Sequence, residues 1–253
     1  MEKTKLNIAI IDYFGSNCAQ DCLTALQTIQ NLHPFLIPGH QRALPPHIHA
    51  ILLPGGFSYG DYIRPGAMAK TAPITSSLYQ HAQKGTPILG ICNGFQILCE
   101  LRLLPGTLQL NAKGRFICQE VHLAIAQRRS PFLAHIPPKK RTLTLPIAHK
   151  YGQYFTSPSN LQQLIKQGQI ALLYSNPQAL PTPQTNPNGS LKNIAAITNK
   201  QGNILGMMPH PERRILPYHG QEDGKYLFQS LLQYLFSKKT LRQTPLGEYP
   251  PFS

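Results

Sequence analysis

The sequence predicts an α/β fold, namely an open, mostly parallel sheet with helices on both faces and a smaller antiparallel patch. Three observations support this fold class. In the first hundred residues, short apolar runs alternate with segments of helical periodicity. The runs are nearly free of polar residues, as is typical of strands buried on both faces. Beyond residue 115, segments with strand-like alternation follow one another with few helical segments between them, which favours antiparallel pairing.

The elements expected in the first half are strands at 6–11, 50–53 and 86–91 and helices at 17–32, 74–84 and 94–103. In the second half we expect strands at 115–125, 142–148, 170–174, 194–198 and 203–208, and a last helix at 224–236. We take residues 1–237 as one domain and residues 238–253 as a C-terminal tail.

Composition narrows the class of protein. A chain of 253 residues can bury the core of one large domain. No segment approaches the ~20 apolar residues of a membrane span, so no membrane partner is expected. Five cysteines, an odd number, do not indicate a disulfide framework, which favours a reducing cytoplasm.

The net charge of +14 arises from 24 basic residues against only 10 acidic ones. The basic pairs are scattered and belong to no recognisable nucleic-acid module, so we expect no nucleic-acid partner. An acidic partner protein fits this charge better.

Cys92 lies where an expected strand meets an expected helix. The segment Gly90-Ile91-Cys92-Asn93-Gly94 has the spacing of a nucleophile elbow, a sharp strand-to-helix turn. The two glycines leave room for that turn, and the helix N-terminus stabilises a thiolate. We therefore predict that Cys92 is a catalytic nucleophile rather than a buried structural cysteine.

A nucleophilic thiol needs a proton shuttle, and His210 is the best candidate. His210 and Glu212 follow the expected strand at 203–208 and lie two residues apart, so in an extended chain their side chains point the same way. Glu212 can then orient the imidazole while the imidazole exchanges a proton with Cys92. The pattern predicts a triad of nucleophile, base and orienting acid.

A glycine pair follows the expected strand at 50–53, where loops of open α/β sheets line the active-site crevice. We expect the backbone N–H groups of Gly56 and Asn93 to form an oxyanion hole. Gln96, one turn beyond Cys92, is expected to hold the backbone of the substrate.

No metal site is expected. Cys18 and Cys22 are four residues apart, but no second Cys/His pair has zinc spacing, so we place both on the face of a helix. A Gly-rich phosphate loop of the G-x-x-x-x-G-K-[ST] type is also absent from the sequence, so no ATP site is expected in this chain.

The chain resembles the class I (triad) glutamine amidotransferases in the segments 54–61, 90–96 and 208–213. More narrowly, it is similar to the glutaminase subunits of phosphoribosylformylglycinamidine synthases. That likeness extends from about residue 6 to about residue 234, and its narrowest signals are Phe57-Ser58-Tyr59-Gly60-Asp61 and Asn186-Pro187-Asn188-Gly189-Ser190.

The resemblance implies that residues 1–237 are a glutamine amidotransferase type 1 domain of that fold. It implies that Cys92 hydrolyses glutamine through a thioester and that the ammonia passes to a separate ATP-dependent synthetase subunit in de novo purine biosynthesis. ATP and Mg²⁺ would then lie on that partner, with no cofactor in this chain. A small accessory subunit would complete the assembly.

The chain departs from the family at one informative position. The family usually has an acidic residue in a His-x-Glu-Gly pattern, whereas this chain reads His149-Lys150-Tyr151-Gly152. Two other functions remain open. A stand-alone cysteine hydrolase or peptidase on the same fold would typically place histidine directly after the nucleophile, where this chain has Asn93. A non-catalytic interaction subunit would not need the triad residues, which are all present.

Overall fold

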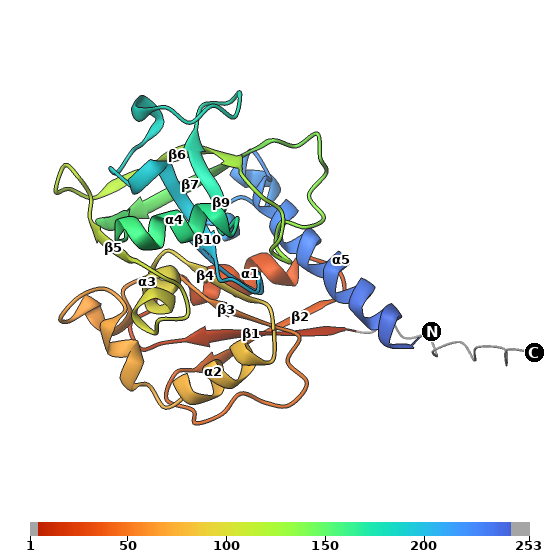
Figure 1. Cartoon of the computed structure of the whole chain (residues 1–253). Helices are drawn as coiled ribbons and strands as arrows, with labels where there is room; N and C mark the ends of the chain where they lie inside the picture. Colours follow the sequence, from red (N-terminus) through yellow and green to blue (C-terminus); the bar gives the residue numbers. More distant parts are fainter. Residues whose placement is uncertain (1–4, 244–253) are drawn as a thin grey trace, which may run out of the picture.

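The computed structural model describes residues 5–243, and a nine-stranded sheet runs through them (Figure 1). Its strands are β1 (Leu6–Asp12), β2 (Leu32–Pro38), β3 (Ala50–Leu53), β4 (Ile88–Ile91), β6 (Ile117–Ile125), β7 (Thr142–His149), β9 (Ile170–Ser175), β10 (Ile194–Thr198) and β11 (Ile204–Met207). Their order across the sheet is β2-β1-β3-β4-β11-β10-β9-β6-β7.

The sheet changes character at β11. From β2 to β11 every neighbouring pair is parallel. From β11 to β7 every pair is antiparallel. The antiparallel strands therefore belong to the same hydrogen-bonded sheet as the parallel strands. The predicted fold class is confirmed. A separate two-stranded antiparallel sheet joins β5 (Thr107–Leu110) to β8 (Tyr151–Phe155).

The α-helices are α1 (Ala19–Gln27), α2 (Thr75–Gln83), α3 (Asn93–Glu100), α4 (Pro158–Lys166) and α5 (Gly224–Gln243). Short 3₁₀ turns are η1 (Ser58–Asp61), η2 (Ala67–Thr71), η3 (Pro183–Thr185), η4 (Leu191–Asn193), η5 (Pro211–Arg213) and η6 (Pro217–His219).

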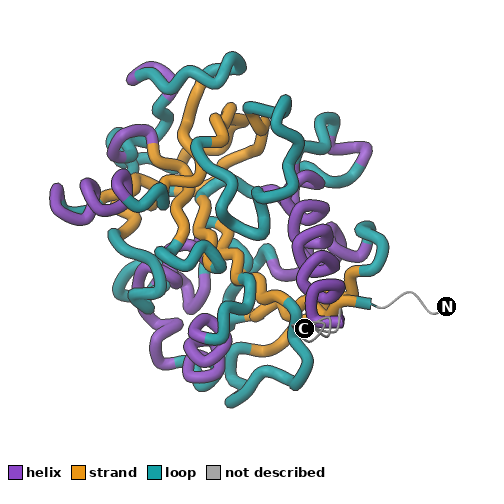
Figure 2. The backbone as a smooth tube through the Cα atoms, turned by 45° about the vertical axis from the view of Figure 1, so that its right-hand side comes forward, coloured by secondary structure: helices purple, strands orange, loops and turns teal. Residues whose placement is uncertain are grey.

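Helices cover both faces of the sheet (Figure 2). In the strand order, the connection through α1 leads from β1 towards the β2 edge of the sheet. The connection through α2 leads in the opposite direction, from β3 to β4. Because crossovers between parallel strands are right-handed, opposite steps place the two helices on opposite faces. Helices α2 and α3 both contact the 3₁₀ turn η2, and helices α1 and α5 both contact the 3₁₀ turn η5.

The central strands are buried along their whole length. Every residue of β3, β4, β10 and β11 is buried. These segments are the uninterrupted apolar runs of the sequence, so apolar burial accounts for their position in the middle of the sheet.

The structure corrects several expected elements. The helix expected at 17–32 ends at Gln27, and the chain continues into the unexpected strand β2. That strand contains Pro34 and ends at Pro38, and it lies at the edge of the sheet, where proline is tolerated. The strands β5 and β8 and the helix α4 were also not expected.

The last helix is longer than expected, since α5 continues to Gln243 rather than ending at residue 236. The expected boundary between domain and tail at residue 237 thus falls within a helix, and residues 244–253 of the tail lie outside the described residues. Within residues 5–243, the structure contains no helix with the length and apolarity that crossing a membrane requires.

We predict that Gly94→Ala destabilises the fold strongly. A Cβ at Gly94 would lie 2.0 Å from the carbonyl oxygen of Leu53, so strand β3 or helix α3 must move. We expect a loss of about 3 kcal/mol or more in the free energy of unfolding, measured by urea denaturation followed by circular dichroism. Gly114→Ala is the control, because its Cβ meets nothing within 4 Å and only its φ of +66° is unfavourable, at about 1 kcal/mol. Equal losses in the two variants would contradict this packing argument.

Candidate active site

Cys92 occupies a strained turn between β4 and α3. Its backbone has φ 51° and ψ −104°, a conformation that is unfavourable for a residue with a Cβ. The turn is held because the Cys92 N–H donates to the Met207 carbonyl at 2.7 Å. Gly90 and Gly94 are both required, since a Cβ on Gly90 would lie 2.6 Å from the Gly94 carbonyl oxygen. The elbow predicted from the sequence is present, and Cys92 is only 5% exposed.

His210 and Glu212 follow the neighbouring strand β11 and form a buried pair. His210 Nδ1 lies 2.6 Å from Glu212 Oε1, with side chains 2% and 0% exposed. The two residues are not in one extended segment, as the sequence argument assumed, because Glu212 lies in the 3₁₀ turn η5. The backbone N–H of His210 donates to the Pro146 carbonyl at 2.9 Å, which fixes the imidazole above the end of the sheet.

The charge of His210 is set by its neighbours. Burial alone would lower the pKa of His210, but the negative charges of Glu212 and Cys92 raise it, to about 10. These neighbours therefore favour the protonated form of the ring, the imidazolium. Within the described residues its Nε2 forms no hydrogen bond of ordinary geometry, although Cys92 is close enough to act on the ring, so this nitrogen remains able to give a proton to a ligand.

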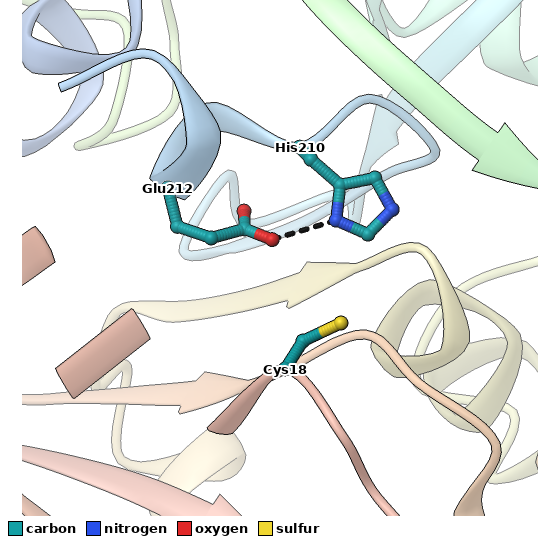
Figure 3. Close-up of side chains that lie close together, drawn as sticks. All are labelled: Cys18, His210 and Glu212. Carbon is teal, nitrogen blue, oxygen red and sulfur yellow. Dashed lines mark hydrogen bonds and ion pairs between the residues drawn. The ribbon is translucent and has the colours of Figure 1, made fainter. Parts of the chain in front are cut away.

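Cys18 lies beside this pair (Figure 3), and donor atoms of Cys18, His210 and Glu212 all lie within 4.8 Å of one another. Such a set could hold a metal ion. However, the Arg213 guanidinium donates to the Cys18 sulfur at 3.2 Å and already provides a positive charge beside that sulfur. Burial raises the pKa of the Cys18 thiol to about 12, so it is a poor metal ligand at neutral pH. Cys18 precedes α1 as its N-cap and Cys22 lies within that helix, both buried.

A cavity of about 330 Å³ opens above Cys92. This volume is sufficient for an amino acid. Its lining includes Cys92, His210 and Gly56, which come from the loops after β4, β11 and β3. The carboxyl ends of these adjacent parallel strands meet at one edge, which is where open α/β sheets bind ligands.

The predicted oxyanion donors lie on two sides of the nucleophile. Asn93 is the first residue of α3, and N–H groups in the first turn of a helix have no partner within the helix. Gly56 has φ +120°, and a Cβ there would lie 2.5 Å from the Asn17 nitrogen. The hydroxyl of Ser16 donates to the Gly55 carbonyl at 2.8 Å. Because C=O and N–H point in opposite directions in a trans peptide, this bond also fixes the direction of the Gly56 N–H.

Gln96 lines the cavity, as expected, but its side chain already has partners. Asn93 Nδ2 donates to Gln96 Oε1 at 2.8 Å, and Gln96 Nε2 donates to the Tyr151 carbonyl at 2.5 Å. Each end of an amide can form a second hydrogen bond, so contact with a substrate stays a prediction. The bond to position 151 uses the main chain, so it does not depend on the tyrosine side chain at that position.

The sequence argument missed a buried histidine, His149, at the end of β7. Asn111 Nδ2 donates to the carbonyls of Arg115 and His149, so Asn111 Oδ1 is an acceptor and His149 Nδ1 carries its proton. Burial, with a contribution from His210, lowers the pKa of His149 to about 4. The ring that lines the cavity is therefore neutral.

Asp61 was also missed, although its segment was noted. It lines the cavity with Lys150 and Arg213, so the wall carries both signs of charge. An amino acid carries both signs as well. The sequence did contain a signal, because Asp61 ends the segment Phe57-Ser58-Tyr59-Gly60-Asp61 directly after the glycine pair. The contact between Asp61 and Asn93, however, is visible only in the fold.

Comparison with known proteins gives a consistent result. A model of the CobB/CobQ-like glutamine amidotransferase domain matches residues 5–236. The phosphoribosylformylglycinamidine synthase subunit PurQ of Zymomonas mobilis is 42% identical over 230 residues, which cover 91% of this chain and 100% of that protein. The subunit of the same name from Aquifex aeolicus is 41% identical over 227 residues, covering 90% and 99% of the two chains.

Solved structures agree with these relatives. A chain in the structure of PurLQS from Thermotoga maritima superposes with a TM-score of 0.80 at 38% identity, covering 92% of this chain and 100% of that chain.

We predict that iodoacetamide alkylates Cys92 faster than the other buried cysteines. Burial raises the pKa of the three other buried thiols, so they remain protonated at neutral pH; they are Cys18, Cys22 and Cys99. The exposed Cys118 is removed in every sample as Cys118→Ser. Mass spectrometry of the labelled peptides over time provides the readout. Faster labelling of Cys18 than of Cys92 would refute the assignment.

Glu212→Gln should slow alkylation of Cys92 at pH 7 by about tenfold, which corresponds to about 1.4 kcal/mol. The reason is that Glu212 raises the pKa of His210 and so keeps the imidazolium that stabilises the thiolate. Glu222→Gln is the control, with an unchanged rate expected, because within residues 5–243 this carboxylate forms an ion pair with Lys225 alone, away from the cavity.

Proposed function

The chain belongs to the CobB/CobQ-like glutamine amidotransferase family, and we propose that it is the glutaminase subunit of a phosphoribosylformylglycinamidine synthase in de novo purine biosynthesis. It hydrolyses glutamine and supplies ammonia to a synthetase subunit on another chain. The observation that carries this proposal is that Cys92 and His210 line one cavity of amino-acid size, with Glu212 paired to His210 behind it.

In the proposed reaction, the thiolate of Cys92 attacks the carboxamide carbon of glutamine and forms the sulfur–carbon bond. The N–H groups of Gly56 and Asn93 stabilise the oxyanion. His210, oriented by Glu212, gives its Nε2 proton to the leaving nitrogen as the carbon–nitrogen bond breaks. Water then attacks the thioester carbon and gives a proton to the now neutral His210, and the sulfur–carbon bond breaks, which releases glutamate and restores the thiolate and the imidazolium. Gln96 contributes to holding the α-carbon groups.

Ammonia from this reaction serves the partner. In our proposal ATP and Mg²⁺ lie on the synthetase subunit, this chain carries no cofactor of its own, and a small accessory subunit completes the complex. All five cysteines are free, which supports a location in the reducing cytoplasm. The buried His210–Glu212 pair and the family relationship favour this enzyme over a non-catalytic subunit, and no observation favours a peptidase.

An apolar surface beside the cavity is the best candidate for docking the synthetase subunit. We call it the apolar rim, and it consists of Phe14, Phe57, Tyr62 and Ile63, which are 80%, 45%, 72% and 72% exposed. Exposed apolar side chains gathered at one site mark protein interfaces. Their two loops are joined, because the Tyr59 N–H donates to the Phe14 carbonyl at 2.6 Å.

The sequence contains a basic pair, Arg213-Arg214, but this pair is a weak candidate for docking an acidic partner. Arg214 donates to the His219 carbonyl and to Glu120, and its side chain is only 18% exposed. Arg213 lines the cavity and contacts Cys18. These contacts engage both side chains within the chain, so an acidic face on the partner would have to meet other basic residues.

We predict that Cys92→Ala in the assembled complex abolishes synthesis from glutamine but not synthesis from added ammonium salt. The acceptor chemistry lies on another chain, so ammonia from solution can replace the lost glutaminase. Formation of the amidine product is measured with each nitrogen source, and Cys118→Ala is the control that should retain both activities. Loss of the ammonium-dependent reaction in an intact complex would contradict this division of labour.

Docking should also control the rate. The apolar rim includes Phe14 and Phe57, which lie close in sequence to Ser16 and Gly56. A partner that binds the rim can therefore change the orientation of the Gly55–Gly56 peptide, which carries one proposed oxyanion donor. Loss of one such donor costs about 10²–10³ in rate. We therefore expect the isolated chain to release glutamate at least about tenfold more slowly than the complex. Equal rates with and without the synthetase subunit would show that no gate exists.

Ser16→Ala tests the same peptide within the complex. Removing the bond from the Ser16 hydroxyl to the Gly55 carbonyl frees the peptide to rotate, and a bond worth about 1 kcal/mol corresponds to about a fivefold fall in kcat. Ser58→Ala is the matched control from the adjoining loop, because its buried hydroxyl has no partner within the described residues. An equal effect of both variants would rule out a specific role for Ser16.

A further inference from the structure

The wall of the cavity carries one carboxylate among the described residues, that of Asp61. Glu212, although next to His210, is fully buried behind it. Tyr151 stands where the family usually has an acidic residue, so this position adds no negative charge. The negative charge of the wall therefore depends on Asp61.

Asp61 is held in place by a strained backbone. Tyr59, Gly60 and Asp61 have φ values of 54°, 65° and 53°, so three consecutive residues adopt the left-handed region. Two of them carry side chains that disfavour it, and such strain concentrates at ligand sites. The strained segment turns the Asp61 carboxylate towards the helix that begins after Cys92, where Asn93 Nδ2 donates to it at 3.3 Å.

The carboxylate lacks a cationic partner. Within residues 5–243 no ion pair involves Asp61, and the long bond from Asn93 is its only recorded hydrogen bond. Burial raises the pKa of Asp61 to about 6, which means that its negative charge is poorly compensated in the empty site. A ligand with a positive charge would relieve this cost.

The position of Asp61 fits one group of the substrate. Asn93 Nδ2 donates both to Asp61 and to Gln96 Oε1, so these two side chains meet on the same side of the cavity, next to Cys92. Three carbons separate the carboxamide of glutamine from its ammonium group. With the carboxamide at Cys92, the ammonium group lies elsewhere in the same cavity, where Asp61 supplies the one carboxylate among the described lining residues.

We propose that Asp61 binds the α-ammonium group of glutamine and so selects the free amino acid over amides that lack this group. The proposal rests on the glutaminase function above and names the residue that recognises its substrate. Lys150 and Arg213, on the same wall, supply the positive charge for the α-carboxylate. Tyr151 contributes only its main-chain carbonyl, which holds Gln96 in place.

The test compares two substrates of the assembled complex, glutamine and 4-carbamoylbutanoate, which lacks only the α-amino group. Ammonia release gives kcat/KM for each. A hydrogen bond to a charged group is worth about 1.5–3 kcal/mol, so the unmodified complex should prefer glutamine by at least about tenfold. Asp61→Asn should lower kcat/KM for glutamine by about the same factor, mainly through KM, and leave that for 4-carbamoylbutanoate unchanged.

Glu100→Gln is the matched control. It neutralises a carboxylate on α3 that pairs with Arg64 and Lys70 and does not line the cavity, so the preference for glutamine should remain. A merely structural Asp61 would lower kcat/KM for both substrates equally, which would overturn the proposal. If the Asp61→Asn variant does not assemble, the measurement on the unmodified complex still tests the proposal. Equal kcat/KM for the two substrates in that complex would overturn it. No ammonia release from glutamine at all would instead refute the proposed function.

Discussion

The active site depends on one constraint of the sheet, the close lateral packing of three parallel strands with β4 in the middle. β4 pairs with β3 on one side and with β11 on the other, so the loops that follow all three strands open at the same edge. Gly94 must pass within contact distance of Leu53 for this to happen. Main-chain packing therefore brings Cys92, Gly56 and His210 to the same cavity, without long side chains reaching across a gap.

The part of this arrangement that could be predicted from the sequence is the part governed by burial and steric fit. Apolar runs located β3, β4 and β11, and the glycines around Cys92 located the elbow. The pairing of His210 with Glu212 was expected too, although through extended geometry, whereas a 3₁₀ turn supplies it. The roles of Gly56, Asn93 and Gln96 remain predictions, and the structure adds that Gln96 already bonds to Asn93 and Tyr151.

What the sequence could not reveal are contacts between segments far apart in the chain. β2 contains proline, which argues against a strand unless its position at the sheet edge is known. The positions of Asp61 and His149 become clear only in the fold, where Asp61 contacts Asn93 and His149 contacts Asn111. The sequence shows Arg214 only as a neighbour of Arg213, whereas the fold shows that Arg214 donates to Glu120 and to the His219 carbonyl.

The central claim is that Cys92 forms a covalent bond to the acyl group of glutamine, assisted by the buried imidazolium of His210. The most direct measurement is mass spectrometry of the assembled complex quenched in acid during turnover of glutamine. The account predicts a glutamyl adduct on the peptide that contains Cys92, which disappears on mild alkaline hydrolysis, and which does not accumulate in Cys92→Ala. Steady glutamate production in Cys92→Ala at the unmodified rate, or an adduct confined to another cysteine, would contradict it.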